Sequence, residues 1–218
     1  MTHNTVNIND LLKSLEGAVK DPAKILTKNK ENPLTKTKQR EALTLFLTAV
    51  ALNESYKYQE EVLHFDVCEN NEQSDSLDGY LKVTYPDGAG MELEFEQVML
   101  TMEEIKDRDE KSDNSELVIE KIKQKHNKKY DNPKGITLVV FLDIEGFVIP
   151  ETIKEYLKEN NIFLFYLLIV LDPQHKSDGS YSYTVMDLNP EREGNHSRFT
   201  IKISEDFSAY EVSLNQKE

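Results

Sequence analysis

The chain has a single cysteine, Cys68, so it can form neither an internal disulfide nor a zinc site from two cysteines of its own. This usage fits a reducing compartment. Long apolar runs are also missing: the longest, residues 162–171, is about half as long as a membrane-spanning helix requires. The first residues lack the basic start and apolar stretch of a secretory signal peptide. We therefore expect a soluble, cytoplasmic protein without a membrane partner.

Several sequence signatures of catalysis are absent as well. The 5 histidines include no HExxH or other closely spaced metal-ligand pair, which argues against a zinc hydrolase. No GxSxG elbow is present, and Cys68 has no recognisable nucleophile context. The glycines at 88 and 90 belong to a turn that no helix follows, so a phosphate-binding loop is not indicated.

The charge is strongly acidic but unevenly distributed. A net charge of −14 argues against a general nucleic-acid binder, because lysine and arginine supply most non-specific affinity for phosphates. Residues 60–120 carry 19 acidic and 4 basic side chains, whereas residues 121–134 carry 6 basic and 1 acidic. This asymmetry permits a local basic face on an acidic protein, and equally a set of solvated helix faces with no partner.

Hydrophobic periodicity predicts a mixed α/β (α+β) fold. Helical spacing of apolar residues predicts helices over 8–20, 39–53 and 115–130 and another that opens at Pro150. Alternating or continuous apolar runs predict the following strands: 60–68, 80–85, 91–100, 136–142, 162–171, 181–188 and 197–203.

These elements are expected to form one central mixed sheet with helices packed on it. The first three strands form an antiparallel meander, and residues 136–171 form a β-α-β unit with a right-handed crossover. Residues 1–37 form an N-terminal helix and linker, and residues 38–218 form a single α/β domain. The 10 tyrosines and 9 phenylalanines supply bulky core material.

Acidic residues cluster on the predicted strand over 91–100. Side chains alternate along a strand, so three glutamates share one face: Glu92, Glu94 and Glu96. No lysine or arginine occurs between residues 83 and 105 to offset them. If this face is partly covered, it needs an opposite charge, a proton or a metal. The alternatives are an amphipathic strand with one face in water, or lysines that come from distant segments.

A neighbouring carboxylate would complete a set of hard oxygen ligands, which Mg²⁺ or Mn²⁺ prefers. Asp78 is the best candidate, because it stands at the entrance to the second strand, and a hairpin turning at residues 87–88 could bring it beside Glu94. Asp87 is the rival, but it lies in a turn, where aspartate is favoured for local hydrogen bonds.

The order of elements and these acids resemble the PD-(D/E)xK nuclease, or restriction-endonuclease-like, superfamily over residues 39–171. In that family an aspartate on the second strand and an acid-x-lysine pair on the third bind metal and activate a water that attacks a phosphodiester. The resemblance implies Asp78 and Glu94 as the metal ligands. Glu96 takes the place usually held by lysine, as in some members, and Glu41 matches a helical position that supplies a further acid in others.

The resemblance therefore implies a Mg²⁺-dependent nuclease with Asp78, Glu94 and Glu96 as its catalytic residues, or an inactive relative of one. Phosphate contacts would come from lysines of the helix over 115–130: Lys121, Lys125 and Lys128, with Lys123 and Lys129. The alternative is a non-enzymatic protein whose acidic residues bind a basic protein partner. A scaffold without a small-molecule site is a third hypothesis.

Overall fold

The computed structural model describes residues 4–15, 33–57, 63–68, 77–101, 109, 111–144, 146–171, 180–190 and 198–214. These residues form four α-helices: α1 (Ile8–Ser14), α4 (Pro33–Tyr56), α5 (Ser115–His126) and α6 (Pro150–Asn160). They also form nine strands: β1 (Thr5–Val6), β2 (His64–Cys68), β3 (Gly79–Thr84), β4 (Gly90–Thr101), β5 (Ile136–Asp143), β6 (Phe165–Leu171), β7 (Tyr181–Asp187), β8 (Arg198–Ile203) and β9 (Tyr210–Leu214). The predicted mixed α/β class is confirmed.

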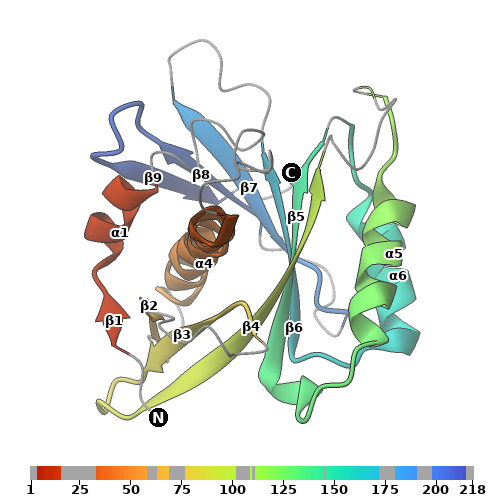
Figure 1. The fold of residues 1–218 in the computed structure, drawn as a ribbon, viewed down its shortest axis with the longest axis horizontal. Helices are drawn as coiled ribbons and strands as arrows, with labels where there is room; N and C mark the ends of the chain where they lie inside the picture. Colours follow the sequence, from red (N-terminus) through yellow and green to blue (C-terminus); the bar gives the residue numbers. More distant parts are fainter. Residues whose placement is uncertain are drawn as a thin grey trace.

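All nine strands join one sheet in chain order, with β1 and β9 at its edges. The pairs β4–β5 and β5–β6 are parallel, and the other neighbours are antiparallel. Parallel neighbours require a crossover, and α5 and α6 lie in the chain at these two crossovers. Figure 1 shows a twisted sheet with α4 on one side and with α5 and α6 together on the other.

Helix α4 fills the concave side of the sheet. It buries apolar residues around most of its circumference: Leu43, Leu45, Phe46, Leu47, Ala49, Val50 and Ala51. A Cβ on Gly79 of β3 would lie 2.4 Å from Leu45 Cδ1, so this glycine permits the close approach of helix and sheet. The helix begins at Pro33 rather than at residue 39, since proline suits a first helical turn. The domain boundary predicted after residue 37 falls inside it.

The opposite face of the sheet carries a second hydrophobic core, which α5 and α6 cover. Strand β5 contributes to both cores, because its side chains alternate. Val139 and Phe141 pack toward α4, while Leu138 and Val140 pack toward α5 and α6. Burial of each such side chain contributes about 1.5–3 kcal/mol relative to exposure. Among the described helices, none combines the length and the apolarity that crossing a membrane requires.

The N-terminal helix joins the α4 core through Leu11, Leu12 and Leu15. Asn7 caps it, since its Oδ1 accepts hydrogen bonds from the backbone N–H of Asn9 at 2.9 Å. The described helix ends at Ser14, and the rest of the predicted helix over 8–20 lies largely outside the described residues. Figure 1 shows α1 beside β9, while β1 lies at the opposite edge. The two edge strands β1 and β9 were not predicted.

Two other predicted elements are longer than the observed ones. The helix predicted over 115–130 ends at His126, with Asn127 as its C-cap. The strand predicted over 162–171 begins at Phe165, and Leu164 N–H just before it bonds to Ile136 O at the entry to β5, at 2.8 Å. Apolar runs alone do not mark such boundaries, since residues just outside an element are buried too.

An aromatic cluster around His126 fastens α5 to β6 and α6. Tyr166 Oη accepts hydrogen bonds from the backbone N–H groups of Ile162 at 3.0 Å and Phe163 at 3.2 Å. Its own proton is therefore left for His126 Nε2, which lies 3.0 Å away. This arrangement requires a neutral imidazole that accepts at Nε2. Burial lowers the pKa of His126 below its usual 6.5, which favours the same neutral form.

We predict that protonation of His126 destabilises the fold. The folded pKa lies below the unfolded value of 6.5, so the stabilisation is complete above that pH and is lost as the pH falls toward the folded pKa. Urea unfolding at pH 7.5 and 5.5 should show a steeper loss of unfolding free energy for wild type than for His126→Gln. Equal pH dependence in the two proteins would contradict the assignment.

We also predict that Cys68 is inert in the folded protein. The residue is 3% exposed, and burial, with a smaller contribution from the charge of Glu92, raises the pKa of its thiol to about 11. Thiolate is the reactive form, so a chromogenic disulfide reagent at pH 8 should label Cys68 only at the rate of local or global unfolding. Rapid, denaturant-independent labelling would show that the end of β2 is open.

Candidate functional site

Two carboxylates meet on the outer face of the sheet, where β3 and β4 pair. Gly79 is the register partner of Phe95, which places Asp78 opposite Glu96. The backbone of β4 fixes both the main chain and the side chain of Asp78. The Asp78 N–H donates to Phe95 O at 3.0 Å, and Asp78 Oδ2 accepts from Gln97 N–H at 2.6 Å. The position of the Asp78 side chain is therefore set by β4, the strand that carries Glu96.

Lys125 of α5 reaches both carboxylates. Its ammonium group donates to Glu96 Oε2 and lies 3.7 Å from Asp78 Oδ2. The side chains of Glu96, Lys125 and Asp78 are 2%, 12% and 32% exposed, respectively. The Glu96 carboxylate is thus buried, whereas solvent reaches the Asp78 carboxylate. We call these three residues the Asp78–Glu96–Lys125 cluster.

The burial of Glu96 decides the energetics of this cluster. A desolvated carboxylate costs several kcal/mol unless an opposite charge and hydrogen bonds compensate it. The strand β4 supplies no lysine or arginine, so the compensation comes from a residue 29 positions away. Lys125 therefore links α5 to β4 at the position of the buried Glu96 carboxylate.

Tyr130 stands beside the same cluster, just after α5. Its hydroxyl is buried next to the carboxylate of Glu96. Burial raises the pKa of Tyr130, and the charge of Glu96, a hydrogen bond to the Glu96 carboxylate and the charge of Asp78 raise it further. A neutral hydroxyl next to two carboxylates can donate a hydrogen bond to a group that enters the cluster.

Of the other residues predicted for the site, those on β4 and α5 lie on the same side of the sheet as the cluster, and Glu41 does not. Glu94 is half-buried on the same face as Glu96, and no ion pair involves it in the described part of the chain. Lys121 is half-buried and Lys128 is exposed on and just after α5. Glu41 belongs to α4, which packs on the opposite face of the sheet. The structure thus brings together Asp78, Glu96 and Lys125 and leaves Glu94 and Lys128 at the periphery.

The donor set bears on the predicted metal. Across the described ranges, no group of three or more His, Cys, Asp and Glu side chains is arranged to hold an ion. Mg²⁺, however, is commonly held by one or two carboxylates together with waters and substrate phosphates. Asp78 and Glu96 meet that requirement in ligand type, and Asp78 is accessible. The ammonium of Lys125 lies between them, so a divalent ion would have to share or take over its position.

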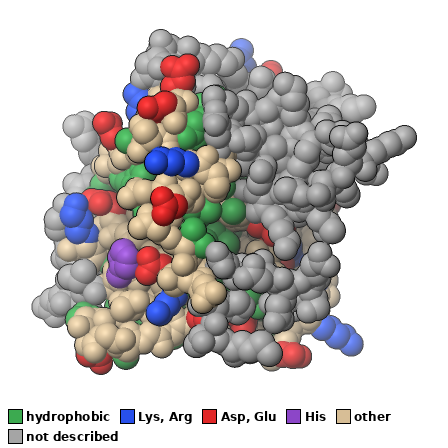
Figure 2. Space-filling model, turned by 60° about the vertical axis from the view of Figure 1, so that its left-hand side comes forward, with side chains coloured by type: hydrophobic (Ala, Val, Ile, Leu, Met, Phe, Trp, Pro, Cys, Tyr) green, Lys and Arg blue, Asp and Glu red, His purple; other side chains and the backbone are tan. Residues whose placement is uncertain are grey.

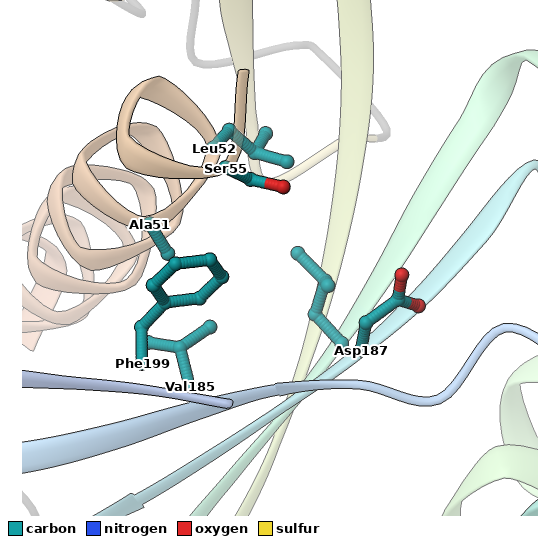
Figure 3. Close-up of a pocket in the computed structure, with 7 residues that line it drawn as sticks. Ala51, Leu52, Ser55, Val185, Asp187 and Phe199 are labelled. Atoms are coloured by element: carbon teal, nitrogen blue, oxygen red, sulfur yellow. The ribbon is translucent and has the colours of Figure 1, made fainter. Parts of the chain in front are cut away.

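Cavities in the described part of the chain lie elsewhere. One, of about 20 Å³, lies between α4 and strands β6 to β8, lined by Ala51, Leu52, Ser55, Leu167, Val185, Asp187 and Phe199. Figure 3 shows Phe199 and Val185 extending toward Ala51 of α4. This volume holds about one water molecule, so it is too small for a substrate. The other is an open groove of about 610 Å³ between α5 and α6.

Charged side chains are mixed on the face that Figure 2 shows. Acidic and basic groups of the described residues alternate there, and no patch of one sign dominates. The carboxylates that share one ammonium group are those of the Asp78–Glu96–Lys125 cluster, under α5.

No family model, curated protein or solved structure matches the chain. A function therefore has to be inferred from the geometry of the described residues themselves.

The sequence indicated part of the cluster. It predicted Asp78 and Glu96 as site residues, and the lack of basic residues between 83 and 105 indicated that a distant partner was needed. It predicted Lys125 as a phosphate contact and did not connect it with Glu96. Tyr130 was missed, since a single tyrosine after a lysine-rich helix carries no distinctive pattern.

We predict that Lys125→Met destabilises the protein by about 3–5 kcal/mol, because it leaves Glu96 buried without a counter-charge. Combining it with Glu96→Leu should recover most of this loss, since no buried charge then remains. Guanidinium unfolding of both variants measures the effect. The matched control is Lys128→Met, an exposed lysine, which should change stability by less than about 0.5 kcal/mol. A small effect of Lys125→Met alone would show that Glu96 is compensated in another way.

Proposed function

We propose that this protein is a divalent-metal-dependent phosphodiester hydrolase of the restriction-endonuclease-like type, acting through the Asp78–Glu96–Lys125 cluster. The observation that carries this proposal is the convergence of an accessible and a buried carboxylate on one ammonium group. Two acids and a lysine are the residue types that the superfamily uses. Here the lysine comes from α5 and not from the strand that bears the second acid.

The order of elements supports the same proposal. Helix α4 is followed by β2, β3 and β4, which pair antiparallel in succession, then by α5 and by β5, which pairs parallel with β4. This sequence of a helix, a meander, a helix and a parallel strand resembles the superfamily's core. The cluster lies on the second and third strands of that series, where the resemblance implies the acids.

The local charge also favours a phosphate-bearing substrate. Lys121, Lys123, Lys125, Lys128 and Lys129 follow one another along the C-terminal half of α5 and just beyond it. Positive charge at a helix C-terminus is favoured by the helix dipole, and Lys123, Lys128 and Lys129 are exposed. A phosphodiester entering over Asp78 would meet this basic segment despite the acidic charge of the whole chain.

Each residue of the cluster has a defined part in the proposed reaction. Asp78, held by the Gln97 N–H, and Glu96 would hold the ion, which when bound lowers the pKa of water and neutralises charge on the phosphate. The Glu96 carboxylate would accept a proton from the water whose oxygen bonds to phosphorus, while the P–O bond to the leaving oxygen breaks and that oxygen takes a proton from solvent. Lys125 would then turn its ammonium group toward the phosphate oxygens, and the Tyr130 hydroxyl would donate a hydrogen bond to the entering group.

This assignment changes the role first given to Glu94. The sequence predicts Glu94 as a metal ligand and Glu96 as the residue in the lysine position, whereas the pairing with Lys125 favours Glu96 and Asp78 as the acid pair. Glu94, two residues away on the same face, is then an outer residue that could bind the ion through water. The variants below distinguish the two assignments.

We predict saturable binding of Mg²⁺ or Mn²⁺ in isothermal titration, and cleavage of labelled single- or double-stranded DNA or RNA that depends on the ion. Asp78→Asn and Glu96→Gln should each weaken ion binding, and Glu96→Gln should lower cleavage by at least about 100-fold, as loss of a general base does. Glu94→Gln should have a smaller effect. Lys125→Arg, which keeps the charge, should retain ion binding but lose cleavage.

The matched control is Asp87→Asn, which removes an acid from the turn between β3 and β4 and should leave binding and cleavage unchanged. Thermal unfolding of each variant separates loss of function from loss of fold. Ion binding without cleavage of any substrate would indicate an inactive relative. Absence of specific ion binding by the folded wild-type protein would contradict the proposal.

A further inference from the structure

Helices α5 and α6 lie side by side on the outer face of the sheet and leave a groove between them (Figure 1). The groove is open and has a volume of about 610 Å³. Its lining alternates between the two helices: Glu116, Ile119 and Lys123 from α5, and Thr152, Glu155, Tyr156 and Glu159 from α6. None of these residues belongs to the Asp78–Glu96–Lys125 cluster, which lies beneath α5.

The groove has an apolar floor and an acidic rim. Ile119 is buried and Tyr156 is half-buried, whereas Glu116, Glu155 and Glu159 are exposed. Glu155 pairs with Lys158 of the same helix at 2.8 Å, and a basic partner would compete with this exposed lysine for the carboxylate. The single cation of the lining, Lys123, places its Nζ 5.1 Å from the centre of the Tyr156 ring. The Tyr156 ring face therefore already accepts a cation, in a groove that three glutamates also line.

An exposed apolar pair continues this surface at the N-terminal end of the two helices. Phe147 is 46% exposed and Ile149 is 39% exposed, although both are large hydrophobic residues. They are fixed in place, since Phe147 N–H donates to Ser112 O at 2.9 Å and Ile149 N–H donates to Ser115 Oγ at 2.8 Å. Ser115 directly precedes Glu116, so the pair adjoins the acidic end of the groove.

Apolar side chains held rigidly in the open, beside a carboxylate-rimmed groove, are typical of a surface that a partner covers. We propose that the groove and the apolar pair Phe147 and Ile149 dock a basic amphipathic helix of another protein. Its apolar face would cover the pair and Ile119, and its arginines or lysines would meet the three glutamates. One of them would replace Lys123 over the Tyr156 ring.

Charge selects this occupant over others. The glutamates of the groove would repel a nucleic-acid backbone, and a second copy of the chain would bring a net charge of −14 of its own. A basic helix is instead attracted by the field of the whole protein and finds an apolar strip bordered by acids, which is the usual helix-in-groove arrangement. The groove and the proposed hydrolase site share only Lys123 of α5, and the inference does not depend on the hydrolase proposal.

The test is fluorescence anisotropy of a labelled 18-residue amphipathic peptide of leucine and arginine, titrated with the full-length protein. The reference is the same peptide with glutamate in place of arginine. Glu155→Gln combined with Glu159→Gln should weaken binding of the basic peptide at least tenfold, and Phe147→Ser should weaken it at least fivefold. The acidic peptide should not bind.

The matched control combines Glu205→Gln with Glu211→Gln, which removes the same charge from exposed positions on and near β9. It should weaken binding less than twofold. If the control weakens binding as much as the groove variants do, the peptide senses only overall charge and the proposal is overturned. Unchanged affinity in the groove variants, or no binding by the wild-type protein at low salt, would overturn it as well.

Discussion

A carboxylate buried in the middle of a sheet has to be neutralised, and in this protein Lys125 neutralises Glu96. Strand β4 is the junction between the antiparallel strands on one side and the parallel strands on the other. The ammonium of Lys125 ties α5 to this junction and brings Asp78 into the same cluster. Because α6 packs beside α5, this charge pair contributes to the placement of the outer layer, together with the apolar core beneath both helices.

The sheet separates two environments with different roles. The α4 side is an apolar core, closed by the leucines of α1 and by apolar residues from most of the strands. The outer side has its own core, but it also carries the Asp78–Glu96–Lys125 cluster and the groove between α5 and α6. The two ends of α5 differ in sign, with Glu116 in the first turn and lysines in the last, as the helix dipole favours. One helix thus borders a basic segment at one end and an acidic groove at the other.

The elements that the sequence specifies well are those with strong local patterns. The strand over 136–142 is buried on both faces, so its continuous run of apolar residues was enough to predict its position. The edge strands β1 and β9 could not, because strands of 2 and 5 residues carry little pattern. The sequence predicts the start of α4 at residue 39, six residues after the observed start at Pro33, because a polar first turn resembles a connecting segment.

The site was predictable only in part, because its three residues are separated by different distances along the chain. Asp78 and Glu96 belong to paired strands, and the hairpin between them makes their meeting foreseeable. The contact of Glu96 with Lys125 depends on how α5 lies across the sheet, which the packing of residues such as Ile122 and Leu138 decides. Sequence patterns identify which face of a helix is buried, but not which of its lysines reaches a given carboxylate.

Charge balance connects the stability of this cluster with its proposed chemistry. Two carboxylates that face one ammonium leave a net negative charge, which the hydrogen bond from the Gln97 N–H to Asp78 Oδ2 offsets in part. A divalent cation would neutralise both acids and release the ammonium, which α5 already presents beside its other lysines. In the proposed reaction, Lys125 would therefore exchange its contact with Glu96, which links α5 to the sheet in the free protein, for a contact with the phosphate when the ion enters. A lysine on a helix, rather than on the strand, is suited to that exchange because its four-carbon side chain can turn without a change in the sheet.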